Sequence, residues 1–154
     1  MPRSRRARAR DIDVLAGALP EVARATAWGD RPAYQVKGRT FVLWRGPRKD
    51  ALGADGERLE DVVMFAVPGP EEKAAMLASG PPWFTTPHFD GYNAVLVQEA
   101  HVGQVSLEEL REVVEDAWLA KAPKRLAAQW LASRETQPNP QRNNRARYEH
   151  RLRR

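Results

Sequence analysis

One segment constrains the fold more than any other, because it ends a helix, makes a turn and starts a strand. Residues 81–93 read PPWFTTPHFDGYN, and the apolar run Ala94–Val97 follows them. Two prolines stop a preceding helix, and Asp90 with Gly91 is a turn signal. Aromatic residues are concentrated here, and bulky rings at such junctions anchor cores. We predict a structural corner or ligand pocket with these members: Trp83, Phe84, His88, Phe89, Asp90 and Tyr92.

Short alternating or apolar runs predict a β-sheet on both sides of this corner. Two of them flank Gly38 and Arg39, which is the pattern of a β-hairpin. The polar stretch 45–61 predicts a long loop or a frayed second hairpin. The predicted strands are residues 25–29, 34–37, 40–44, 62–67 and 94–98.

Helical periodicity and capping signals predict the remaining elements. Ser106 and Glu109 form a capping box, in which the hydroxyl accepts from the Glu109 amide and the carboxylate reaches back. The predicted helices begin at Asp11 or Asp13, at Pro70 with Ala74, Leu77 and Ala78 inward, at Ser106, and after Pro123. Strands grouped between helices indicate an α+β fold, an antiparallel sheet with helices packed on it. We expect a single domain over residues 11–132.

Charge divides the chain into two basic ends and an acidic body. Residues 1–10 carry five arginines and no acidic residue, and residues 134–154 carry seven arginines against two glutamates. The segment 11–133 has 13 basic and 18 acidic residues, although the whole chain has a net charge of +5. Neither end has apolar periodicity, so we predict a disordered basic arm at 1–10 and a disordered basic tail at 133–154.

Three stretches carry a family resemblance. They are residues 19–41, with LPEV, WG, YQVKGR and Phe41; residues 86–92, TPHFDGY; and residues 107–126, with LEEL, AW and APKRL. Together they resemble the MmcQ/YjbR family of small bacterial proteins, often labelled DNA-binding, across residues 11–132. The resemblance implies a YjbR-like antiparallel sheet with helices and offers no catalytic residues. That family more often has a basic residue and a tryptophan after the corner, whereas Asp90–Asn93 follow here, so no basic contact is transferred to this corner.

Catalytic and metal signatures are weak in this sequence. His88 and Asp90 could supply two metal ligands or a base with its orienting carboxylate, but no third ligand accompanies them. We interpret His88 as a structural residue that bonds a backbone carbonyl. The sequence has no cysteine, nucleophile elbow, phosphate-binding glycine loop or paired-carboxylate motif. We predict a protein that is not an enzyme and needs no cofactor or metal.

The hairpin region is the basic part of the expected domain. Its cations are Arg31, Lys37, Arg39, Arg45, Arg48 and Lys49. The leading hypothesis is a cytoplasmic, non-enzymatic protein that contacts the phosphate backbone of DNA or RNA through this hairpin and its arginine tails. An equally good interpretation is that these charges mark a solvated edge strand. Two other classes stay open: an adaptor that binds a protein partner with a chaperone-like sheet, and a small-ligand pocket under the corner aromatics. No apolar run is long enough to span a membrane.

Overall fold

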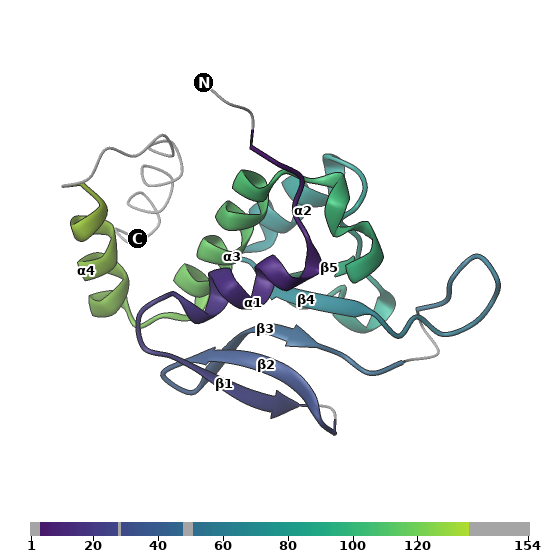
Figure 1. The fold of residues 1–154 in the computed structure, drawn as a ribbon, viewed down its shortest axis with the longest axis horizontal. Helices are drawn as coiled ribbons and strands as arrows, with labels where there is room; N and C mark the ends of the chain where they lie inside the picture. The colour runs from purple at the N-terminus through teal and green to yellow at the C-terminus, as the bar shows by residue number, and fades with distance from the viewer. Residues whose placement is uncertain (1–3, 28, 48–50, 136–154) are drawn as a thin grey trace.

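A five-stranded antiparallel sheet forms the centre of the protein (Figure 1). The computed structural model describes residues 4–27, 29–47 and 51–135. The strands neighbour one another in chain order, and each pairs antiparallel to the next. Their bounds are β1 Val22–Ala27, β2 Arg31–Val36, β3 Arg39–Trp44, β4 Val62–Ala66 and β5 Ala94–Gln98. The predicted α+β class is therefore confirmed.

The predicted hairpin is the connection between β2 and β3. Lys37 and Gly38 have φ angles of 49° and 79°. Two consecutive positive φ values are typical of the tight turn whose twist matches that of the flanking strands. The register shifts between Tyr34 and Gln35, so a bulge leaves Phe41 without a direct partner in β2. This turn carries Lys37 to one end of the sheet.

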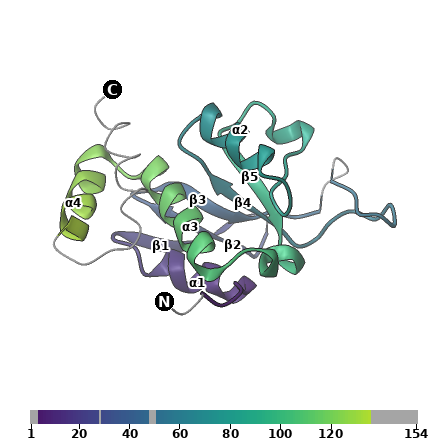
Figure 2. The same cartoon turned by 90° about the horizontal axis from the view of Figure 1, so that it is seen from above.

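Helices cover one face of the sheet (Figures 1 and 2). Their bounds are α1 Ala9–Gly17, α2 Pro70–Ala78, α3 Leu107–Lys121 and α4 Lys124–Glu135, with short 3₁₀ turns at Pro87–Phe89 and Glu99–Gln104. Leu110, Val114 and Trp118 of α3 are fully buried, as their helical spacing predicts. In the described part of the chain, no helix has the length and apolar composition needed to cross a bilayer.

The aromatic corner wraps the β5 edge, which confirms its place at a junction of elements. Phe84 exchanges two backbone hydrogen bonds with Leu96, so it extends the sheet by one bridge. Phe89 packs against Val62 and Ala94 on the face opposite the helices. The corner therefore closes the part of that face formed by β4 and β5.

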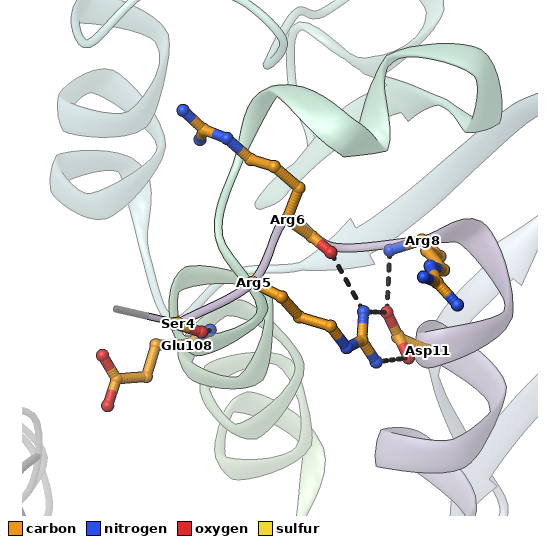
Figure 3. A network of polar contacts seen from close by, with 6 residues as sticks. All are labelled: Ser4, Arg5, Arg6, Arg8, Asp11 and Glu108. Carbon is orange, nitrogen blue, oxygen red and sulfur yellow. Dashed lines mark hydrogen bonds and ion pairs between the residues drawn. The ribbon is translucent and has the colours of Figure 1, made fainter. Parts of the chain in front are cut away.

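Residues 4–10 differ from the disorder predicted for the N-terminal arm, because they are tied to the start of α3 (Figure 3). The Arg5 backbone carbonyl accepts from the Leu107 amide at 2.8 Å, and the Ser4 hydroxyl accepts from the Glu108 amide at 3.1 Å. Ser106 then accepts from Glu109 through its hydroxyl at 3.1 Å, as the capping box predicts. The first amides of α3 have no partner inside the helix, so these contacts stabilise both segments.

Two helix details also correct the sequence reading. In α2 the buried side chain is Lys73, at 8% exposed, whereas Ala74 and Ala78, which we expected to face inward, are exposed. The first helix begins at Ala9, so Asp11 lies inside its first turn, where its carboxylate accepts from the Arg8 amide. In α2 the contact between Lys73 and the distant corner outweighs local periodicity. In α1 the contact between Asp11 and the preceding Arg8 amide does so.

Candidate nucleic-acid interface

The six hairpin cations do not form one surface. Arg45 is only 1% exposed, and its guanidinium carbon lies 5.0 Å from the centre of the Phe89 ring. A buried guanidinium over an aromatic face cannot reach phosphate, so the expectation for Arg45 is wrong. Arg48 and Lys49 lie outside the described residues.

Arg31 lies at the other end of β2 from the hairpin turn. Its guanidinium donates to the Glu60 carbonyl at 2.8 Å. Lys37 lies six residue steps after Arg31, which at 3.3 Å per strand residue amounts to roughly 20 Å. Arg31 therefore does not share a phosphate site with the turn.

Arg39, one of the two cations at the turn, contacts the end of α3 instead. Arg39 Nη1 donates to the Lys121 carbonyl at 3.3 Å. A helix leaves its last carbonyls without partners and with partial negative charge, so a cation is favoured there. Lys37 pairs with Glu21 at 3.7 Å, and both side chains are more than half exposed, so this pair is weak and exchangeable.

Cations of the connection between α3 and α4 complete this region, which we call the basic end: Lys37, Arg39, Lys121, Lys124 and Arg125. Pro123 separates the two helices, because the preceding Ala122 is extended, at ψ 143°. Lys124 and Arg125 are exposed, and neither makes a salt bridge with any residue of the described ranges. The basic end thus gathers charge from segments more than 80 residues apart.

Sequence reasoning missed three members of the basic end. Lys121, Lys124 and Arg125 stand within five residues, in KAPKR. This cluster of cations is a local signal. It is cancelled by the acidic residues at the start of α3 when charge is averaged over the whole helix. Their proximity to Arg39 follows only from the tertiary contact.

The corner residues do not converge on one pocket. The Trp83 ring meets Phe65 edge-on at 6.1 Å on the helix-covered face, whereas Phe84 and Phe89 pack on the opposite face. Tyr92 is 60% exposed and its ring stacks on exposed His88, at 5.9 Å. No third ligand joins His88 and Asp90, since no group of three metal-binding side chains occurs among the described residues. The corner is a structural element with a solvent-facing ring pair.

Ring contacts and one ion pair hold α4 against α3. The ring centroids of Trp118 and Trp130 lie 5.3 Å apart, and the Arg134 guanidinium carbon lies 4.6 Å from the Trp130 centroid. Arg134 Nη1 donates to Glu115 Oε2 at 3.1 Å. Burial raises the pKa of Glu115 to about 7, although the positive charges of Arg134 and Arg111 oppose the increase.

The Glu115→Gln substitution is expected to remove part of the pH dependence of stability. Because the folded-state pKa of Glu115 is about 7 against an ordinary value of 4.5, the folded protein holds this proton more tightly than the unfolded chain. The stability from this group is present at low pH and is lost as pH rises through the folded-state pKa. Between about pH 5 and pH 8, wild type should lose roughly 2–3 kcal/mol more unfolding free energy than the variant. Urea unfolding at both pH values measures the difference, and equal losses would refute it.

The sheet with its helical layer defines the protein as an α+β domain, and comparison with known proteins identifies the family. A family model described as YjbR matches residues 17–120. The chain belongs to the YjbR family, as the resemblance implied. The matched range includes Lys37 and Arg39 and ends one residue before Lys121.

Relatives occur in mycobacteria. A protein of Mycobacterium bovis and a protein of Mycobacterium tuberculosis are each 35% identical to this chain over 130 residues, covering 80% of this chain and 95% of the relative. Both have names that describe them as uncharacterized proteins. No solved structure matches the chain.

Proposed function

We propose that this protein is a non-enzymatic, cytoplasmic nucleic-acid-binding protein that contacts phosphates with the basic end. The contact between Arg39 and the Lys121 carbonyl carries the proposal, because it joins the cations of the hairpin turn to those of the α3–α4 connection. Clustered lysine and arginine side chains displace counterions from a nucleic acid when they bind its phosphates. The six arginines of residues 136–154 follow α4 and add to the same attraction.

The proposed contacts are to the phosphate backbone and not to base edges. A helix that reads bases in the major groove presents basic or amide side chains to them. The longest helix, α3, instead has exposed Glu108 and Glu109 in its first turn. We therefore expect similar affinity for duplexes of different sequence.

The double substitution Lys124→Ala with Arg125→Ala is expected to weaken binding through salt-sensitive contacts. In a titration of a labelled duplex at several salt concentrations, the slope of log affinity against log salt should become shallower by about 2, since each phosphate contact contributes about 0.9. Both residues lie at the positive end of α4, so loss of their charge does not destabilise that helix.

Arg58→Ala is the matched control for this titration. Arg58 is exposed like the two target residues, but it lies in the excursion between β3 and β4, at the far end of the molecule from α4 (Figures 1 and 2). The slope of log affinity against log salt for the Arg58→Ala variant should equal that of wild type. An unchanged slope for the Lys124 and Arg125 variant would refute a phosphate contact at the basic end.

The free edge of the sheet favours one second candidate, an adaptor for a protein partner. β1 pairs with β2 alone among the described strands, so one row of its backbone groups faces outward. Such an edge can accept a strand from another protein. This candidate gains support if the full chain shows no salt-dependent binding to DNA or RNA.

A further inference from the structure

We propose that the bound nucleic acid lies along the outer face of α1 and contacts a second group of cations, Arg6, Arg8 and Arg10. This inference rests on the proposed function, because it extends the path of the same phosphate backbone beyond the basic end. Three observations support it: the backbone that carries these arginines is fixed, their side chains face solvent, and the outer face of α1 between the two groups of cations has no exposed carboxylate. Exposed Glu21 lies just past this face and is paired with Lys37, and exposed Glu108 and Glu109 belong to the start of α3.

The backbone of the second group is held on the body of the protein. Arg6 forms an antiparallel bridge with Ser106, and the Ala7 amide donates to the Val105 carbonyl at 2.9 Å. Arg5 binds the Asp11 carboxylate through both terminal nitrogens, at 2.8 and 2.9 Å (Figure 3). Cations on a fixed backbone lose less conformational freedom on binding than cations on an unfolded arm.

The three arginines remain available for phosphate. Arg6, Arg8 and Arg10 are all exposed, and none of them forms a salt bridge with a residue that the structure describes. Arg6 uses one terminal nitrogen for the Gln104 carbonyl, at 3.2 Å. The neighbouring carboxylate of Asp11 is neutralised by Arg5, so it does not repel a phosphate nearby.

The outer face of α1 continues from Arg10 without an exposed carboxylate. Val14 is 67% exposed and Ala18, just past the helix, is also exposed; these positions follow Arg10 at intervals of four residues and therefore lie on one side of the helix. Asp13 is partly buried and accepts from the Tyr34 hydroxyl at 2.6 Å. A phosphate backbone can thus pass along this face.

The distance between the two groups of cations sets the length of ligand required. Arg5 meets Leu107 at the start of α3, and Arg39 meets Lys121 at its end, while α1 lies beside α3 in both views (Figures 1 and 2). The 15 residues of α3 span about 22 Å at 1.5 Å per residue. That length corresponds to about six or seven base pairs at 3.4 Å each.

Substitutions on the outer face of α1 test this path in the full-length chain. Arg8→Ala with Arg10→Ala should make the salt slope shallower by about 2 for a DNA hairpin with a 12-base-pair stem. The same variant should differ less from wild type on a 4-base-pair stem, which is too short to reach both groups. RNA hairpins of equal stem length show whether DNA or RNA is preferred.

A charge placed midway along the path gives a second, independent test. Val14→Glu should weaken binding to the longer hairpin by about threefold to tenfold, because a carboxylate beside the phosphates repels them. Val14→Gln, of equal size and without charge, should bind like wild type, and both variants should keep the wild-type melting temperature, since Val14 packs little.

If the α1 variants bind nucleic acid as tightly as wild type while the Lys124 and Arg125 variant binds more weakly, the α1 path is overturned and the proposed function stands. Absence of salt-dependent binding by the wild type itself would overturn both.

Discussion

Replacing Lys73 by methionine should destabilise the fold by about 3–5 kcal/mol, because two strong hydrogen bonds to a charged donor are lost inside the structure. Lys73 is 8% exposed, and its ammonium group donates to the carbonyls of Phe89 and Tyr92, the latter at 2.7 Å. Methionine fills a similar volume but offers no donor, so each carbonyl loses its charged partner and keeps only a backbone amide, that of Tyr92 or Ala94. The corner would then separate from α2.

Urea unfolding of the Lys73→Met variant measures this cost. Lys124→Met is the control, since Lys124 is an exposed lysine at the start of a helix, and its effect should stay within about 0.5 kcal/mol. A Lys73→Met variant as stable as this control would show that the lysine does not hold the corner in place.

Trp118→Ala should be comparably severe, at about 3–5 kcal/mol, because it removes the largest fully buried side chain. The indole contacts Trp130 of α4, and its Nε1 donates to the Pro20 carbonyl at 3.1 Å. One ring therefore ties α3 to α4 and to the segment that leads into β1. Its loss leaves a cavity where these elements meet.

Trp118→Phe separates the ring from its hydrogen bond. Phenylalanine keeps most of the apolar contact but leaves the Pro20 carbonyl unpaired, so we expect a loss of roughly 1–3 kcal/mol in thermal or urea unfolding. Equal losses for the alanine and phenylalanine variants would contradict a packing role for the indole.

Local signals in the sequence predicted most of the fold. The hairpin predicted around Gly38 and Arg39, the Ser106 cap and the helix break at Pro123 each depend on neighbouring residues. The structure contains all three, with the hairpin turn one residue earlier, at Lys37 and Gly38. The alternation of apolar and polar side chains along the strands and the glutamates in the first turns of the helices are likewise local signals. Such features determine elements and their order, which suffices for the α+β class and the family.

The candidate site depended on contacts that no local pattern contains. Arg45 is covered by Phe89, and Arg39 reaches Lys121, across 44 and 82 residues of chain respectively. The fixed position of residues 4–10 likewise depends on Ser106 and its neighbours, about 100 residues away. Composition indicated a basic hairpin and an unfolded arm, whereas tertiary contacts bury Arg45 and fix the backbone of residues 4–10.

An NMR titration of the full-length protein with a 12-base-pair DNA duplex locates the interface residue by residue. We expect the backbone amide signals of Arg8, Arg10, Val14, Arg39, Lys124 and Arg125 to shift together and to return as salt is added. Shifts confined to residues 87–92 of the aromatic corner, or to residues 136–154 alone, would contradict an interface built from the basic end and α1.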